Sequence, residues 1–264
     1  MKIASVEAGI YASPEGLIQQ AFEICFAAAE RKIDYLVFPE LSLHGVAQSA
    51  AEAEALADQL AEDSWEQLSD LVNELELTVV LGHYARNARG KIVNRASTLA
   101  PGGARWHYDK IHLFDALGSQ ESLIVQAGSP DGDKLDPHFL GTLPVSNATC
   151  FDIRFPELFI DLASRGAQIV SIGAAWFDGP NKAEQLEVLV RARALDAGLV
   201  LALACAKGAP FTGRSGIWGP DGALLSSFED YSFGGLATAE IKDEFVDAIR
   251  NSLPLATLRR LDSP

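Results

Sequence analysis

The sequence predicts an α/β protein in which helices pack on mixed β-sheets. Segments with helical periodicity alternate along the chain with short apolar segments that are typical of buried strands. Two turn sequences, Pro-Gly-Gly at 101–103 and Pro-Asp-Gly at 220–222, lie between strand-like segments and predict hairpins. The predicted strands are numerous for one open sheet, which favours two sheets packed face to face.

The first half of the chain predicts strands and helices in turn. Residues 2–6 have the pattern of a strand, and Ile18, Phe22, Cys25 and Ala29 then recur at helical spacing. The next elements are a strand at 35–38, helices near 51–60 and 65–75, and strands at 78–82, 91–99 and 104–108.

The second half begins with a long loop at 115–130 and continues the alternation. A strand near 143–149 ends at Cys150, and a helix near 156–165 follows, with Gly166 at the position of a C-cap glycine. The remaining elements are a strand at 169–172, a helix at 182–197, strands at 199–204, 217–218, 224–226 and 235–239, and a short C-terminal helix.

Composition limits the classes of partner. The 264 residues are 48% hydrophobic, without a low-complexity linker, so we expect one domain over residues 1–264. The formal net charge is 21 − 36 = −15, which would repel a phosphate backbone and gives no attraction to anionic membranes. We therefore expect neither nucleic acid nor a membrane as partner.

The cysteines and the N-terminus predict a cytoplasmic protein. No secretory signal and no apolar run of about 20 residues is present. Cys25, Cys150 and Cys205 form no disulfide framework and no zinc-ligand spacing, which suits a reducing compartment. We expect no metal and no other cofactor.

Cys150 is the most informative of the three thiols. It lies where a strand turns sharply into a helix that Pro156 can begin, so its sulfur is expected at the sheet edge. Backbone N–H groups in such a turn can lower a thiol pKa and bind an oxyanion, as covalent acyl transfer requires. A small buried thiol is the alternative interpretation, and it is the one we favour for Cys25 and Cys205.

Two further segments carry groups that such chemistry needs. Lys110 follows a strand among aromatic and apolar residues, where an ammonium needs a counter-charge. Glu40 directly follows an apolar strand and Pro39, at the sheet end where α/β proteins place their sites, and is a candidate general base. Taken alone, each is more simply a surface residue, and Glu121 is equally ambiguous. His112 is expected to be a packed, hydrogen-bonded histidine.

Together these segments resemble the nitrilase (carbon–nitrogen hydrolase) superfamily. The resemblance covers nearly the whole chain in the family's order and is carried by the segments 38–40, 108–115, 150–158, 163–167, 191–194, 213–216 and 220–222. It implies a four-layer α-β-β-α sandwich, with two facing mixed sheets flanked by helices, and a homodimer or higher homo-oligomer. The strand at 145–149 is more polar than is usual in that family.

The resemblance also implies roles for single residues. Cys150 would form a thioester, Glu40 would move the protons, and Lys110 with the N–H of Phe151 would stabilise the tetrahedral intermediates. Glu121 matches a second glutamate of the family, which lies close to the three catalytic residues and supports them.

Within the family, the sequence looks closest to the compact amidases, which resemble ω-amidases and deaminated glutathione amidases. We therefore predict hydrolysis of a small amide, such as an α-keto-acid amide. A carbamoylase, another aliphatic amidase or a non-catalytic scaffold are the alternatives. Substrates with carboxylates would need a cation, and the candidate contacts for substrate are Arg154, Trp176, Lys207 and Arg214.

Overall fold

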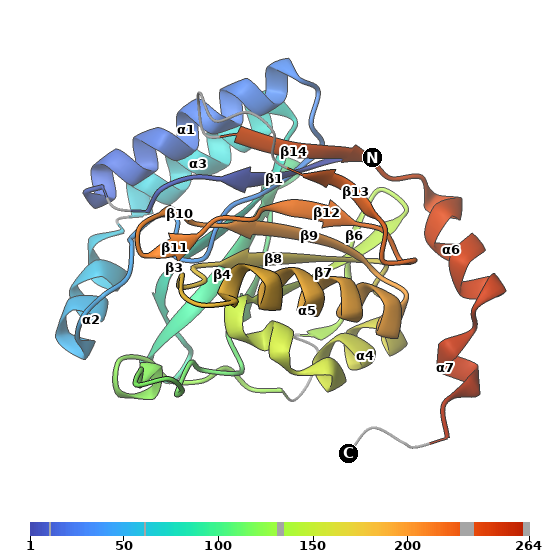
Figure 1. Ribbon diagram of the computed structural model, residues 1–264. Helices are drawn as coiled ribbons and strands as arrows, with labels where there is room; N and C mark the ends of the chain where they lie inside the picture. The colour runs from blue at the N-terminus through green and yellow to red at the C-terminus, as the bar shows by residue number, and fades with distance from the viewer. Residues whose placement is uncertain (11, 61, 131–134, 228–234, 261–264) are drawn as a thin grey trace.

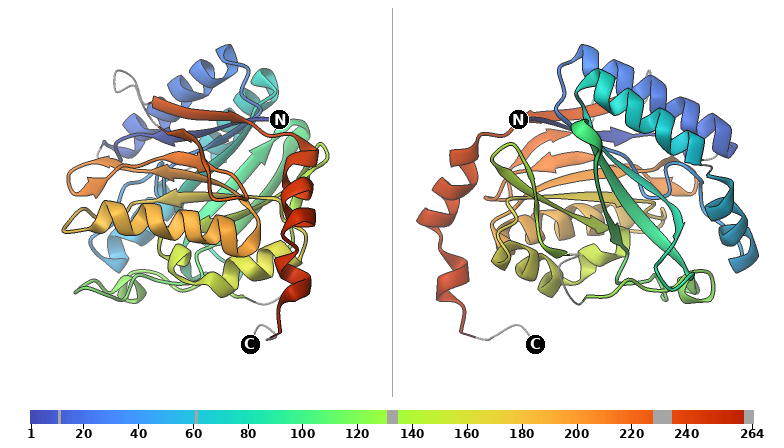
Figure 2. Two further views of the ribbon diagram at one scale, coloured as in Figure 1. Left: turned by 45° about the vertical axis from the view of Figure 1, so that its right-hand side comes forward. Right: turned by 180° about the vertical axis from the view of Figure 1, so that it is seen from behind.

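Two six-stranded sheets pack face to face, with helices on their outer faces (Figure 1). The computed structural model describes residues 1–10, 12–60, 62–130, 135–227 and 235–260. Both sheets contain parallel and antiparallel pairs. The layers are therefore α-β-β-α, and the predicted fold class is confirmed (Figure 2).

The first sheet joins the N-terminal half of the chain to its last strand. Three parallel strands, β1 to β3, are extended on one side by an antiparallel hairpin, β4 and β5, and on the other by β14. Its strands, in spatial order, are β14 (Gly235–Glu240), β1 (Lys2–Glu7), β2 (Tyr35–Val37), β3 (Thr78–Arg86), β4 (Ile92–Ala100) and β5 (Ala104–Asp109). Helices α1 (Pro14–Glu30) and α3 (Glu62–Leu75) cover its outer face, and α2 (Ala50–Gln59) contacts β3.

The second sheet has the same plan. Its parallel strands are β7, β8 and β9, and antiparallel strands complete both edges. In spatial order they are β13 (Leu224–Ser227), β12 (Gly216–Trp218), β9 (Val200–Cys205), β8 (Ile169–Ala174), β7 (Leu143–Thr149) and β6 (His138–Leu140). Helices α4 (Pro156–Ser164) and α5 (Lys182–Ala197) cover its outer face, and α6 (Asp243–Ser252) and α7 (Leu255–Leu258) follow at the edge of the molecule (Figure 1).

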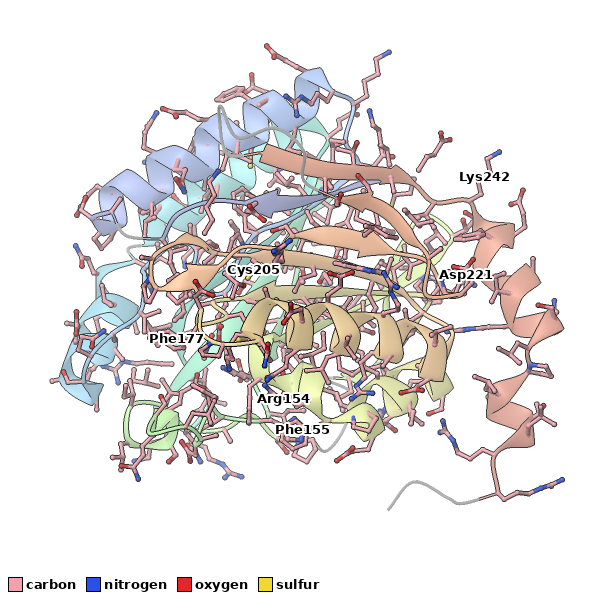
Figure 3. The ribbon with its side chains drawn as sticks, in the orientation of Figure 1. Arg154, Phe155, Phe177, Cys205, Asp221 and Lys242 are labelled. Atoms are coloured by element: carbon pink, nitrogen blue, oxygen red, sulfur yellow. The ribbon has the colours of Figure 1, made fainter. Side chains whose placement is uncertain are left out.

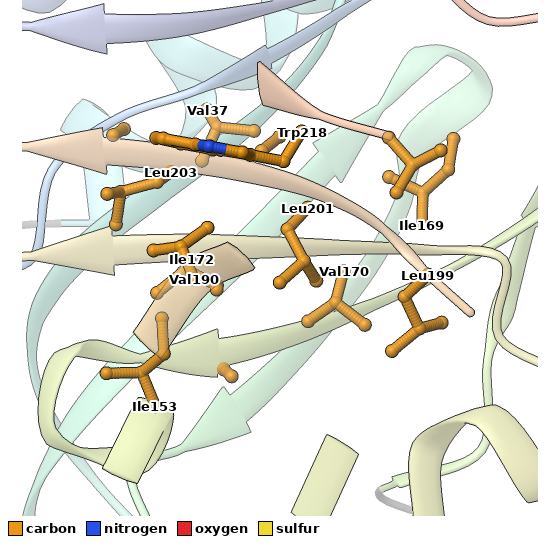
Figure 4. Close-up of a cluster of buried hydrophobic side chains, with 14 of the residues drawn as sticks. Val37, Ile153, Ile169, Val170, Ile172, Val190, Leu199, Leu201, Leu203 and Trp218 are labelled. Carbon is orange, nitrogen blue, oxygen red and sulfur yellow. The ribbon is translucent and has the colours of Figure 1, made fainter. Parts of the chain in front are cut away.

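The main core lies on both sides of the second sheet. Figure 4 shows Val37 of β2 in one cluster with Leu201 of β9 and with Val190 of α5, so inter-sheet and helix–sheet packing are continuous. The predicted buried strand at 199–204 is confirmed, because all six residues of β9 are buried. No helix among the described residues is long and apolar enough to cross a lipid bilayer.

The buried side-chain amide of Asn147, a polar residue of β7, has hydrogen-bond partners on both sheets. Asn147 Nδ2 donates to Thr98 Oγ1 over 3.0 Å, and Asn147 Oδ1 forms a short contact with the Ser171 hydroxyl. Tyr35 Oη donates to Ser171 Oγ over 3.1 Å. This network, drawn from β2, β4, β7 and β8, explains how Asn147 packs in the core: its amide nitrogen has a partner on the facing sheet, and its amide oxygen has one on the neighbouring strand β8.

The structure differs from the sequence prediction mainly in short strands. β6 and the two-residue strands β10 (Lys207–Gly208) and β11 (Phe211–Thr212) were not predicted, because two or three residues carry no periodic signal. β3 runs to Arg86 and not only to 82, since its last four residues pair with β4. The C-terminal helix is two helices. Gly166, at a φ of +103°, does follow α4 as predicted.

We predict that Asn147→Ala lowers the free energy of unfolding by about 2–4 kcal/mol, because it takes one buried hydrogen-bond partner from each of the Thr98 and Ser171 hydroxyls and leaves a cavity in the core. Urea denaturation would measure this. Asn251→Ala, at an exposed position of α6, is the matched control and should change stability by less than about 0.5 kcal/mol. Equal losses in the two variants would contradict the role of the network.

Candidate active site

Cys150 lies at the turn that joins β7 to α4. The strand ends at Thr149, a 3₁₀ turn covers Cys150–Arg154, and Pro156 begins the helix. Cys150 itself has a φ of +46°, a left-handed conformation that is unfavourable for a residue with a Cβ. Its side chain is 8% exposed and lines a cavity of about 360 Å³. The predicted strand-to-helix turn is therefore present, and it aims the sulfur into a cavity.

Glu40 reaches the same cavity from between the sheets. It follows β2 and Pro39, and the segment passes close to one glycine on each sheet. A Cβ at Gly82 of β3 would lie 2.8 Å from Pro39 O, and one at Gly173 of β8 would lie 2.9 Å from Glu40 N. Only glycine allows this close approach. Glu40 Oε2 accepts the N–H of Ala175 over 2.9 Å, which fixes the carboxylate.

Lys110 follows β5 and is 2% exposed. Its Nζ lies 2.8 Å from Glu40 Oε1 and 2.8 Å from Glu121 Oε2. A buried ammonium needs counter-charge, and here it has two carboxylates. The three groups that the sequence singled out, Glu40, Lys110 and Cys150, thus line one cavity, and Glu121 lines it with them.

Asn94 was not predicted. This residue of β4 is 1% exposed, and its Nδ2 donates to Glu40 Oε1 over 2.8 Å and to Glu121 Oε1 over 3.0 Å. It holds the two carboxylates on either side of Lys110. The only signal in the sequence is a lone amide in a segment that is mostly apolar or hydroxylated, and that signal is weak.

The charges of these groups set the directions of their pKa shifts. Burial alone would lower the pKa of Lys110, but the charges of Glu121 and Glu40 outweigh burial, and the pKa lies well above its ordinary value. Burial raises the pKa of Glu121, yet the Lys110 ammonium brings it below its ordinary value. Lys110 is thus a cation and Glu121 an anion at neutral pH.

The Cys150 thiol is not acidified. Burial raises its pKa first and the Glu40 charge raises it further; Lys110 and the Ala175 N–H oppose them without reversing the direction. The lowered thiol pKa expected from the turn amides is therefore wrong in its net direction, because burial beside a carboxylate is the stronger effect. The sulfur is a thiol that also hydrogen-bonds to Glu40.

Asp152 joins the cysteine turn to the lysine segment. This fully buried carboxylate accepts the Thr149 N–H over 2.9 Å and the Tyr108 hydroxyl over 2.7 Å. It also accepts the His112 N–H over 2.9 Å and contacts His112 Nδ1 over 2.7 Å. The His112 ring stacks on Phe155 with centroids 3.7 Å apart. His112 is thus the packed, hydrogen-bonded residue that the sequence predicted.

The other predicted contacts fall in different places. Trp176 and Phe151 line the cavity with Cys150, and Arg154 lines a neighbouring cavity that shares Phe151. Lys207 and Arg214 do not reach this region, since both line a separate cavity with Glu7. Lys182, which the sequence did not single out, lines both the Cys150 cavity and its neighbour.

Cys25 and Cys205 are the buried core thiols that the sequence predicted. Cys25 is on the inner side of α1, Cys205 ends β9, and burial raises the pKa of each to about 12. Within the described ranges, no group of three or more His, Cys, Asp or Glu side chains is arranged to hold a metal ion.

Comparison with known proteins decides the family. The pattern of the carbon-nitrogen hydrolase family matches residues 2–251. The chain belongs to the carbon–nitrogen hydrolase family. It is 32% identical over 249 residues to the deaminated glutathione amidase of Escherichia coli O157:H7, covering 92% of each chain. The predicted family is confirmed.

Solved structures agree on the fold of this hydrolase. The NitFhit protein of C. elegans superimposes with a TM-score of 0.88 at 24% identity, over 98% of this chain and 65% of that chain. A mutant amidase from Nesterenkonia sp. AN1, with acrylamide added at its active-site cysteine, superimposes with a TM-score of 0.77 at 21% identity, over 96% of this chain and 98% of that chain.

We predict that iodoacetamide labels Cys150 of the folded hydrolase and leaves Cys25 and Cys205 unmodified, because only the first thiol opens on a cavity. The rate should still rise with pH above 9, since the pKa of Cys150 lies above its ordinary value of 9.0 and the thiolate fraction grows with pH. Peptide mass spectrometry would measure both. A rate that levels off near neutral pH, or equal labelling of all three, would contradict the described site.

We also predict that Asp152→Ala lowers the free energy of unfolding by about 3–5 kcal/mol, because it leaves four donors of a buried network unpaired. Tyr108→Phe removes a single one of these donors and should lower it by only about 1 kcal/mol. Chemical denaturation measures both values. A loss in Asp152→Ala as small as in Tyr108→Phe would show that the carboxylate does not join the two segments.

Proposed function

We propose that this hydrolase cleaves the carbon–nitrogen bond of a small amide through a thioester on Cys150. The observation that carries the proposal is the meeting of a thiol, an ammonium and a carboxylate in one cavity, although they lie far apart along the chain. Glu40 contacts the other two groups: its Oε1 lies 2.8 Å from Lys110 Nζ, and its carboxylate accepts a hydrogen bond from the Cys150 thiol.

In the first half-reaction Glu40 acts as general base. Because the thiol keeps its proton at neutral pH, Glu40 takes that proton as the sulfur attacks the amide carbon. Lys110 and the N–H of Phe151 stabilise the oxyanion of the tetrahedral intermediate. Glu40 then returns the proton to the amide nitrogen, the carbon–nitrogen bond breaks, and ammonia or an amine leaves the thioester on Cys150.

The second half-reaction releases the acid. Glu40 takes a proton from water, whose oxygen attacks the thioester carbon, and the intermediate collapses with return of that proton to the sulfur. Glu121 and Asn94 serve as positioning residues: they hold Lys110 and Glu40 in place and touch neither sulfur nor substrate in this account.

The substrate that we propose is an α-keto-acid amide such as deaminated glutathione or α-ketoglutaramate. A cavity of about 360 Å³ suits a small molecule, and a relative of full length bears the name deaminated glutathione amidase. N-carbamoyl compounds are the alternative within the same chemistry. Detection of the released gas separates the two, because a carbamoylase yields carbon dioxide with the ammonia.

We further propose a homo-oligomer in the cytoplasm. The outer helix α5 exposes Val188 and Leu195, which are apolar side chains that a second copy could cover. All three cysteines are free, which agrees with a reducing compartment.

The test is the pair Cys150→Ser and Glu40→Gln with Cys25→Ser as control. We expect Cys150→Ser to lose hydrolysis of small amides, measured by ammonia release, and Glu40→Gln to lower kcat about a thousandfold because the proton carrier is gone. Glu40→Gln should still take up acrylamide at Cys150, as a mutant of the Nesterenkonia amidase does at its active-site cysteine. Cys25→Ser, a change to a buried thiol far from the cavity, should keep its activity.

Full amidase activity in Cys150→Ser would overturn the thioester mechanism. An unchanged kcat in Glu40→Gln would show that Glu40 is not the general base of this mechanism, even if Cys150 proved essential.

A further inference from the structure

Lys182 lies where two cavities meet. It begins α5 and lines both the Cys150 cavity, of about 360 Å³, and a neighbouring cavity of about 890 Å³. The residues shared by the two cavities are Phe114, Ser119, Phe151, Phe177 and Lys182. A molecule bound to the sulfur therefore extends past this lysine as it leaves the floor of the site.

Arg154 lies against the same aromatic ring as Lys182. Lys182 Nζ is 4.8 Å from the Trp176 centroid, and Arg154 Cζ is 4.9 Å from it. The lysine is also 5.8 Å from the Phe114 ring, and the arginine is 5.9 Å from the Phe151 ring. Both cations are partly buried, and aromatic faces hold them near one another (Figure 3 labels Arg154 and Phe177).

These two cations have no acidic partner in the described part of the chain. Neither forms an ion pair, and the hydrogen bond of Arg154 goes to the neutral amide oxygen of Gln185 over 3.0 Å. Asp178 lines the second cavity, but its Oδ1 accepts the N–H of Gly179 over 2.8 Å. Two neighbouring cations without a counter-charge repel each other, and an anion bound to both would remove that repulsion.

The surroundings favour an external anion. Burial and the charge of Arg154 both lower the pKa of Lys182, so the pair repels itself in the empty site. The first turn of α5 lines the same cavity through Lys182 and Gln185, so the positive end of the helix dipole lies beside it. The carboxylates on the cavity floor, Glu40 and Glu121, are held by Lys110 and do not extend to this pair.

We infer that Lys182 and Arg154 bind a carboxylate of the substrate, so that this hydrolase selects amides that carry a second, anionic end. The inference rests on the proposed function and names the residues that give the site its preference. An ion pair with a partly desolvated cation favours the anionic substrate over a neutral one of the same shape by about tenfold or more. Lys182 thus determines the substrate preference, and Arg154 binds the same substrate carboxylate.

The experiment compares glutaramate, which has an amide and a carboxylate, with pentanamide, its neutral analogue. We expect the wild-type enzyme to prefer glutaramate in kcat/KM, and Lys182→Met and Arg154→Met each to reduce the ratio of the two kcat/KM values about tenfold. Lys182→Glu should bring kcat/KM for glutaramate below that for pentanamide, and it should favour an amide with a terminal ammonium over pentanamide. Lys242→Met is the matched control, because it removes an equal charge at an exposed position far from Arg154 (Figure 3), and its ratio should equal the wild-type value.

Binding to the Cys150→Ser variant, measured by calorimetry, separates this inference from the proposed function. Tighter binding of glutaramate than of pentanamide supports the inference if the difference is lost on adding Lys182→Met. This holds even if the wild-type enzyme hydrolyses neither compound, because a lack of hydrolysis would contradict only the amidase proposal. A wild-type enzyme without preference, or a preference that Lys182→Met and Arg154→Met leave unchanged, overturns the inference while amide hydrolysis stands.

Discussion

The site depends on one buried charge. Lys110 is 2% exposed, and an ammonium removed from water at that depth is stable only beside compensating charge. Glu40 and Glu121 provide it at 2.8 Å each, and Asn94 holds both carboxylates in place. The carboxylates keep the lysine charged, and burial, together with the charge of Glu40, keeps the Cys150 thiol protonated. A neutral nucleophile beside a carboxylate needs a base at contact distance, which is the position that Glu40 occupies.

The framework around this charge is built to prevent movement. The Glu40 segment fits between the sheets because Gly82 and Gly173 have no Cβ, and Asp152 ties the cysteine turn to the lysine segment through four contacts. Both devices act between chain segments that are distant in sequence. A shift of either sheet would therefore separate the sulfur from the carboxylate and the ammonium at once. The buried hydrogen bonds from Asn147 to Thr98 and from Tyr35 to Ser171 join the two sheets and oppose such a shift.

Much of this could be predicted from the sequence, because local patterns express local constraints. The strand that ends at Cys150, the strand and proline before Glu40, and the helix that begins at Lys182 are each visible in a few residues, and the structure has them all. Asn94 could not be singled out, since its importance lies in two contacts made by folding and not in its neighbours along the chain. The pKa of Cys150 was expected in the wrong direction for a related reason: depth of burial is a property of the packed molecule.

The distribution of charge gives the cavity a direction. Its floor carries Lys110 against Glu40 and Glu121, a net charge of −1 with the thiol protonated. The proposed attack keeps the total at −1, because Glu40 is neutralised by the thiol proton while the negative charge passes to the oxyanion of the intermediate. A substrate carboxylate is repelled from such a floor. Lys182 and Arg154, at the junction with the second cavity, carry the opposite charge. An anionic amide is therefore attracted at one end and repelled at the other, so that the neutral amide group, and not the carboxylate, faces the sulfur. Selection of the substrate and orientation of its scissile bond then follow from one electrostatic gradient. A neutral amide would be neither selected nor oriented by this gradient.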